Sequence, residues 1–178
     1  MRHGLIRSIL TLLIAPVVLP MRLILQRVLS ASVTVDSKTV SSVGPGVVAL
    51  VGLHVDDCAS DLRYCARKLV GSKLWPNDNS KPWRQSVRQM EFDVLLVSQF
   101  TLFGDVSNKK SVPDFKLSKK SEAAFAMYEE FKSIVAAEYG GDDANSKVHD
   151  GIFGANMQLA LVNDGPVTLV VDSQSDQR

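Results

Sequence analysis

Two predominantly apolar runs constrain the fold of this chain most strongly. The first runs from Val47 to Val55 and has the sequence VVALVGLHV, and the second runs from Phe92 to Phe100 and has the sequence FDVLLVSQF. Both have the length of strands, and neither alternates apolar with polar residues, so each predicts a strand that is buried on both faces. The second strand ends in polar residues, where chemistry could sit.

Two other segments have the spacing of apolar residues that is typical of amphipathic helices. The first follows Asp56-Asp57, which are candidate N-caps, and ends at Gly71. The second is capped by Ser118 or Ser121 and is stopped by Gly140-Gly141. The core-facing positions are Leu62, Cys65, Ala66 and Leu69 in the first helix and Ala124, Tyr128, Phe131 and Val135 in the second.

The remaining apolar segments predict further strands. Residues from Met21 to Val35 alternate or are β-branched, and a hairpin turn is expected at Asp36-Ser37-Lys38. Near the end, Met157 to Leu161 and Val167 to Val171 predict a pair of strands around a turn at Asn163 to Pro166. Many strands with two helices that do not alternate regularly with them favour a single α+β domain over a doubly wound sheet.

The first twenty residues differ from the rest of the chain. They contain two arginines, one histidine and no acid, together with an apolar run from Ile9 to Leu19. This segment resembles a targeting sequence and is too short to cross a membrane comfortably. The alternative is an upstream start codon, with Met21 as the functional start. The expected organisation is an extension at 1–20, a domain at 21–172 and a polar tail at 173–178.

Composition excludes several familiar functional classes. Lys and Arg number 20 against 19 Asp and Glu, so no strong overall field attracts nucleic acid or membrane. The two cysteines are too few for a disulfide framework or a four-ligand zinc site. His54 is expected to be structural and His149 to be solvated, and no common hydrolase or metal motif is present. An enzyme of this sequence would lack the usual catalytic triad and metal.

Three local features remain as candidates for function. The polar pair Ser98-Gln99 lies where a buried strand emerges, which suits an oxyanion site but is equally an ordinary strand end. The run Asn163 to Pro166 has ordinary turn composition. The third feature is a cluster of basic side chains that could meet phosphates or be merely solvated. It comprises Lys109, Lys110, Lys116, Lys119 and Lys120.

Taken together, these runs resemble the D-aminoacyl-tRNA deacylase family. The landmarks occur in the family's order and approximate spacing. They are LILQRV at Leu23 to Val28, ASVTV at Ala31 to Val35, SQFTL at Ser98 to Leu102, PDF at Pro113 to Phe115, FGANMQ at Phe153 to Gln158 and NDGPVT at Asn163 to Thr168. The resemblance covers about Met21 to Val171. Val112 departs from it, because the family usually has a basic residue before this proline, which puts the details of tRNA backbone contact in doubt.

The resemblance implies a fold, partners and a reaction. The fold would be α+β, a barrel-like arrangement of largely antiparallel sheets with two helices packed outside. The protein would be an obligate homodimer with active sites at the subunit interface. Its expected reaction is proofreading hydrolysis of the ester between a D-amino acid, or glycine, and the 3′ end of tRNA. No metal or organic cofactor and no stable membrane insertion are expected, and the expected compartment is the cytoplasm, or the mitochondrion if residues 1–20 are a presequence.

The resemblance also implies roles for individual residues. Ser98, Gln99 and Phe100 would line the pocket, with Thr101 nearby and backbone N–H groups near Gln99 and Phe100 stabilising the oxyanion. Phe153 and Met157 would hold the terminal adenine of the tRNA. The 2′-hydroxyl of the terminal ribose would assist the attacking water.

A second group of residues would act in chiral selection. Gly165-Pro166, joined by a cis bond, would reach into the partner's pocket and exclude L-aminoacyl groups. Arg27 would brace this element, and Asn163, Val167 and Thr168 would flank it. Two other hypotheses remain open: a non-catalytic nucleic-acid-binding module, and an esterase for small D-amino-acid derivatives.

Overall fold

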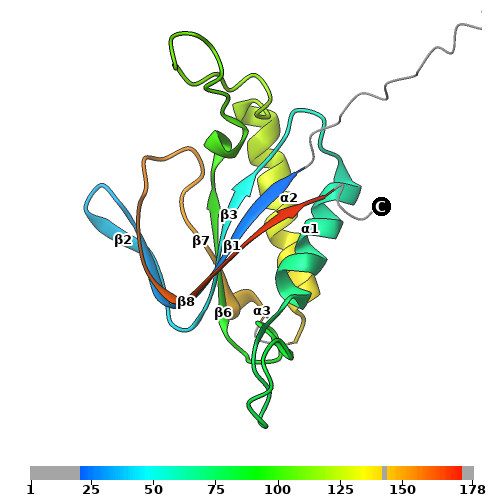
Figure 1. Ribbon diagram of the computed structural model, residues 1–178. Helices are drawn as coiled ribbons and strands as arrows, with labels where there is room; N and C mark the ends of the chain where they lie inside the picture. Colours follow the sequence, from blue (N-terminus) through cyan, green and yellow to red (C-terminus); the bar gives the residue numbers. More distant parts are fainter. Residues whose placement is uncertain (1–20, 142–143, 174–178) are drawn as a thin grey trace, which may run out of the picture.

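A computed structural model describes residues 21–141 and 144–173 of the 178-residue chain. The expectations for residues 1–20 and for nearly all of the tail lie outside the described residues. Within the described part, no helix is long and apolar enough to cross a membrane. Figure 1 shows a curved sheet with helices packed along one side of it.

Strand β1 (Arg22–Val35) organises the main sheet. Along one edge it pairs with β8 (Gln158–Asp172), and along the other it pairs first with β3 (Gly46–Gly52) and then with β2 (Lys38–Val43), all antiparallel. Beyond β3, the strands β6 (Asp93–Ser98) and β7 (Val148–Asp150) continue the sheet in parallel. The short strands β4 (Lys73–Trp75) and β5 (Gln85–Ser86) form a separate pair. The sheet is therefore mixed, with both predicted buried strands at its centre.

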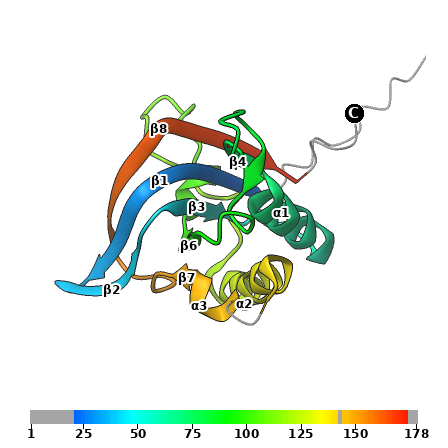
Figure 2. The same cartoon turned by 90° about the horizontal axis from the view of Figure 1, so that it is seen from below.

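Helices α1 (Ala59–Gly71) and α2 (Ser121–Tyr139) lie side by side on the same side of the sheet (Figure 2). Their apolar faces enter one core, in which the predicted positions Leu62, Tyr128 and Phe131 are buried. A turn η1 (Phe100–Phe103) and a short helix α3 (Ala144–Lys147) complete the domain. The predicted α+β, barrel-like single domain is confirmed, with α3 as an additional third helix.

Both predicted helix starts need correction. The N-cap of α1 is Cys58, whose backbone N–H is accepted by the Asp61 carboxylate at 2.9 Å, and Asp57 is turned into the protein instead. Cys58 is exposed, whereas Cys65 is buried as expected. At the second helix, Lys120 occupies the N-cap position and Ser121 is the first helical residue. Capping by a side chain was inferred from composition, but the tertiary contacts of the preceding loops decide which residue lies at the boundary.

The predicted turn between two final strands is wrong, because β8 is one continuous strand. Val28 pairs with Asn163 and Arg27 pairs with Val167, so Asp164, Gly165 and Pro166 loop out between neighbouring pairs. We call these three residues the β8 bulge. Turn-forming residues show where the chain leaves regular strand geometry. They do not show whether the chain then reverses direction, as in a hairpin, or resumes pairing with the same neighbouring strand, as β8 does with β1.

Candidate active site

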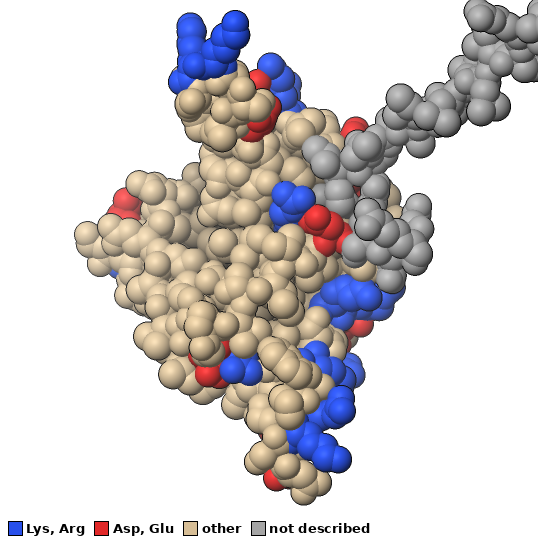
Figure 3. Space-filling model, in the orientation of Figure 1, with Lys and Arg blue, Asp and Glu red and all other residues tan. Residues whose placement is uncertain are grey.

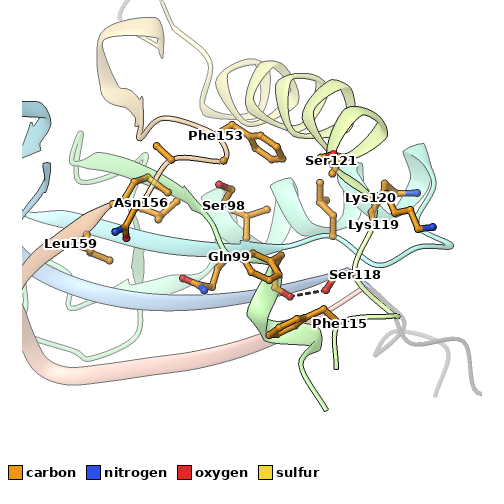
Figure 4. Close-up of a pocket in the computed structure, with 18 residues that line it drawn as sticks. Ser98, Gln99, Phe115, Ser118, Lys119, Lys120, Ser121, Phe153, Asn156 and Leu159 are labelled. Carbon is orange, nitrogen blue, oxygen red and sulfur yellow. Dashed lines mark hydrogen bonds between the residues drawn. The ribbon is translucent and has the colours of Figure 1, made fainter. Parts of the chain in front are cut away.

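A cavity of about 510 Å³ lies between the end of β6, the start of α2 and the loop before β8. Figure 4 shows Phe153 beneath α2, with Lys119 and Lys120 at one end of the cavity and Asn156 and Leu159 at the other. Ser98, Gln99, Phe100, Phe153 and Met157 all line it. The structure thus brings five of the predicted site residues together, although they come from segments more than fifty residues apart.

The segment after β6 presents backbone amides at the cavity wall. The N–H of Gln99 donates to the Val51 carbonyl at 2.8 Å, so this amide is occupied by the sheet. The next two amides, of Phe100 and Thr101, begin η1 and have no acceptor within that turn. The Thr101 side chain is exposed, lies outside the cavity lining and is bonded by the Gln99 side chain. Of these amides, that of Gln99 is occupied and Thr101 lies outside the lining, so only the amide of Phe100 is available to a ligand in the cavity.

Ser118, which lines the cavity next to this segment, holds it in place, a role that the sequence did not reveal. Its side chain is buried, and its hydroxyl donates to the Phe100 carbonyl at 2.8 Å (Figure 4). The Phe100 ring meets the Phe115 ring edge-on, with 4.9 Å between ring centroids. The sequence indicated only that Ser118 could cap a helix, because a contact across eighteen residues of irregular chain leaves no local pattern.

Phe153 is held in place by other aromatic rings. Its ring centroid lies 5.4 Å from that of Tyr128 and 5.5 Å from that of Phe125. Phe153 itself is half-buried, so part of its surface remains open to the cavity that it lines. A fixed, partly exposed ring of this kind can stack on a planar ligand.

The residues predicted for chiral selection lie elsewhere. Arg27 contacts Asp164 of the β8 bulge, with its Nε 3.0 Å from the carboxylate and 3.3 Å from the backbone carbonyl, and it also donates to the Leu74 carbonyl. The Gly165-Pro166 peptide bond is cis, and both residues are exposed. Neither Arg27 nor any residue from Asn163 to Thr168 lines the cavity of the same chain. Within one subunit, the two predicted half-sites are separate.

Strand β8 also has an unusual outer edge. Among the described strands it pairs only with β1, so its other edge is open. Val162, Leu169 and Val170 on this strand are 53%, 41% and 61% exposed. Figure 3 shows a broad surface without charged side chains over this part of the molecule. An open edge with exposed apolar residues is a surface that another chain can cover.

The predicted basic cluster is divided between two places. Lys119 and Lys120 line the cavity, and the Nζ of Lys119 donates to the Val55 carbonyl at 2.8 Å. Lys109 and Lys110 are exposed on the loop that precedes α2, and Lys116 pairs with Asp114 at 2.6 Å. The cluster is therefore not a single basic surface.

The two histidines of the domain are away from the cavity. His54 is buried against the Phe103 ring, its Nδ1 accepts the Asp56 N–H at 3.2 Å, and burial lowers the pKa of its imidazole. His149 lies in β7, half-buried and 3.8 Å from the Asp93 carboxylate, so the prediction of a solvated loop histidine is wrong. Among the described residues, no group of three or more potential metal ligands is present.

Comparisons with known proteins agree with the resemblance seen in the sequence. The family model described as D-Tyr-tRNA(Tyr) deacylase matches residues 24–172. A D-aminoacyl-tRNA deacylase of Yarrowia lipolytica is 43% identical over 158 residues, which cover 88% of this chain and all of that protein. The enzyme of the same name from Saccharomyces cerevisiae is 37% identical, covering 86% and 99%.

Two solved structures are similar to the whole described domain. A structure titled "c-Myc DNA Unwinding Element Binding Protein" is 34% identical, with a TM-score of 0.77, and the match covers 85% of this chain and 97% of that one. A structure of a probable eukaryotic D-amino acid tRNA deacylase is 25% identical, with a TM-score of 0.72, covering 85% and 98%.

The α+β fold, the cavity at the end of β6 and the deacylase family match together place the chain in the class of small α+β hydrolases. Within that class, the chain belongs to the D-Tyr-tRNA(Tyr) deacylase family, whose curated members are named D-aminoacyl-tRNA deacylases. The family predicted from the sequence runs is confirmed.

Proposed function

We propose that this protein is a proofreading enzyme that hydrolyses the ester between a D-amino acid, or glycine, and the 3′ end of tRNA. The observation that carries this proposal is the cavity, in which the SQFTL segment and the FGANMQ segment meet in a member of the deacylase family. No metal or organic cofactor takes part in the proposed reaction. We expect the reaction to occur in the cytoplasm, or in the mitochondrion if residues 1–20 act as a presequence.

The terminal adenosine would occupy the part of the cavity beside Phe153 and Met157, with its base stacked on the aromatic ring. The ester carbonyl would then face the segment after β6. There the backbone amide of Phe100 would stabilise the oxyanion that forms when water attacks, since preorganised donors act most strongly where charge develops. The 2′-hydroxyl of the terminal ribose would assist that water, because the described cavity lining contains no His, Asp or Glu that could act as a base.

Selection against L-amino acids would come from the partner subunit. The β8 bulge is exposed and lies beside an open, apolar strand edge, so a second copy of the chain could cover this edge and receive the bulge in its cavity. The partner's Gly165 and Pro166 would present a rigid backbone wall that leaves no room for an L side chain. The ion pair between Arg27 and Asp164 would keep that wall in position.

The test is deacylation of D-Tyr-tRNA and of L-Tyr-tRNA by the purified protein in excess chelator. Rapid hydrolysis of the D ester, with the L ester left intact, is the expected result. Equal rates on both esters would refute exclusion of the L side chain. Activity that disappears with the chelator would show that a metal takes part. The same assay with a tRNA ending in 2′-deoxyadenosine checks the assisting hydroxyl, because hydrolysis should then fall strongly.

A second candidate is a nucleic-acid-binding module without catalysis. A 34% identical solved structure is titled as a DNA-unwinding-element binding protein, and Lys109 and Lys110 are exposed. Binding to tRNA or DNA without turnover of any D-aminoacyl ester would favour it. A third candidate, an esterase for small D-amino-acid derivatives, would hydrolyse substrates that lack the terminal adenosine.

A further inference from the structure

A buried carboxylate lies outside the active site, where β1 begins. Asp57 is only 7% exposed, and its carboxylate accepts the backbone N–H of His54 at 2.6 Å and a hydrogen bond from the backbone of Met21. In the described part of the chain, no ion pair joins Asp57 to a lysine or arginine, and Lys119 acts on it only at longer range. Burial raises the pKa of Asp57 to about 7. Burying an ionised carboxylate costs free energy of folding unless a cation is buried next to it.

The surroundings of Asp57 are strongly acidic. Burial raises the pKa of the Cys65 thiol, and Asp57, Asp61 and Asp172 lie close enough to raise it further. Asp172 has a cation of its own, because Arg22 pairs with it at 2.7 Å. Among the described residues, the partners of the Asp61 carboxylate are uncharged: the Ser173 hydroxyl at 2.6 Å, the Cys58 N–H at 2.9 Å and the Cys58 thiol at 3.1 Å. Three carboxylates thus lie near the Cys65 thiol, only Asp172 among them is paired with a guanidinium, and Asp57 is bonded to the backbone of Met21.

Met21 itself is held firmly. Its side chain is fully buried in the core, and its carbonyl accepts the Ser173 N–H at 3.0 Å. The start of β1 and the end of β8 lie side by side next to α1 (Figure 1), where Arg22 pairs with Asp172 in the sheet. Packing and pairing therefore fix the Met21 nitrogen against the Asp57 carboxylate.

We propose that Asp57 is the counter-ion of a free α-ammonium group at Met21, and that the functional form of the protein begins at this residue. An α-amino group has an ordinary pKa of about 7.7–8.0, so it is largely protonated at neutral pH. At this position it would supply the missing cation and three N–H donors in place of one amide. The family model matches this chain from residue 24, and the Yarrowia lipolytica relative aligns over its whole length to 158 of the 178 residues. Initiation at Met21 or removal of residues 1–20 would both produce this form.

The direct experiment is to purify the endogenous protein and determine its N-terminus by intact mass and N-terminal sequencing. We expect an unblocked Met21. A native protein that retains residues before Met21, or that carries an acetyl group on Met21, would overturn the proposal.

A second experiment tests the ion pair. The chains 1–178 and 21–178 are compared, each with Asp57 and with Asp57→Asn, by urea unfolding; the shorter chain contains every strand and helix of the described fold. We expect a higher urea midpoint for 21–178 than for 1–178, and loss of most of that difference in Asp57→Asn. The matched control is Asp56→Asn, which removes the neighbouring exposed carboxylate and should leave the difference unchanged. An equal difference with and without Asp57 would refute the ion pair.

If Asp57→Asn does not fold, the unmodified 21–178 chain still decides the question. The pKa of the Met21 α-amino group can be measured by NMR or by the pH dependence of its acylation. The neighbouring ionisable groups are those of Arg22, His54, Asp57, Asp61, Cys65, Lys119 and Asp172. Because the carboxylates among them outnumber the cations, a value above 8.0 is expected. An ordinary or lowered value would overturn the proposal.

Discussion

The residues from Ser98 to Thr101 and the β8 bulge differ in what surrounds them. The first segment follows a central strand and forms the wall of a cavity, where Ser118 holds the Phe100 carbonyl. The bulge projects from the outermost strand, and its contacts within the chain come mainly from Arg27 at its base. One region lines a cavity of its own chain, from Ser98 to Phe100, and the other projects away from that cavity.

This difference indicates how far each region can act alone. The cavity wall has its backbone donor, its aromatic ring and its supporting hydrogen bond within one chain. Arg27 holds Asp164 of the bulge, but no residue of the bulge lines the cavity of the same chain. Under the proposed function, the first region supplies chemistry and the second supplies selectivity across the subunit interface. Changes to the two regions should therefore produce different kinetic signatures.

The largest effect is expected from placing a charge on the open edge of β8. Val170→Lys replaces a side chain that is 61% exposed, and burying an unpaired charge in a dimer interface costs several kcal/mol. Because about 1.4 kcal/mol corresponds to a factor of ten, deacylation of D-Tyr-tRNA at nanomolar enzyme should fall on the order of 100-fold. Sedimentation and the deacylation assay measure the two consequences together.

Val106→Lys is the matched control, since it adds the same charge at a side chain that is 59% exposed on the loop before α2. It should remain dimeric and active. A Val170→Lys protein that is monomeric yet fully active would refute the shared active site.

A smaller effect is expected from Phe153→Ala, which removes the ring from the cavity. Stacking of a base on an aromatic ring contributes about 1–3 kcal/mol, so KM should rise about 10- to 100-fold with little change in kcat. Ile152→Ala controls for changes in the same loop, because Ile152 is exposed and does not line the cavity. An unchanged KM in a correctly folded Phe153→Ala protein would place the adenine elsewhere.

Gly165→Ala should act on selectivity. Gly165 has a φ of +117°, and an added Cβ would lie 3.0 Å from Cγ2 of Val167, so the β8 bulge must shift. Strain of this kind costs about 1–3 kcal/mol, and we expect the preference for D over L esters to fall about tenfold. At Gly44 the added Cβ meets no atom within 4 Å, so Gly44→Ala should preserve the preference. Unchanged selectivity in Gly165→Ala would argue against a role of the bulge in exclusion.

The smallest effect is expected from Thr101→Ala. This side chain is exposed and lies outside the cavity lining, so kcat should change by less than about fivefold if backbone amides carry the chemistry, because one hydrogen bond contributes about 1 kcal/mol. Thr101→Ser, which keeps the hydroxyl, is the control. Complete loss in Thr101→Ala with full activity in Thr101→Ser would favour a side-chain nucleophile.

Much of this fold could be predicted because its signals are local. The apolar run at Val47 to Val55 and the face of α2 that contains Tyr128 and Phe131 have periodicities that are visible within a few turns or pleats. The hairpin at Asp36 and Ser37 follows from turn chemistry, and both residues have positive φ. The five predicted site residues that line the cavity could be named in advance because they lie in the family landmarks. Periodicity alone indicated only that a strand ends at Ser98-Gln99.

The sequence by itself determined the core strands, the helix faces and the family. Only the tertiary structure decided that the Gln99 amide is occupied by Val51, that Ser118 supports Phe100, and that Asp57 is buried beside Met21. It also decided that the run at Asn163 to Pro166 is a bulge in one strand. The physical reason is that backbone preference and periodicity act over a few neighbouring residues, whereas pairing register, burial and the partner of a polar group depend on segments that meet only after folding.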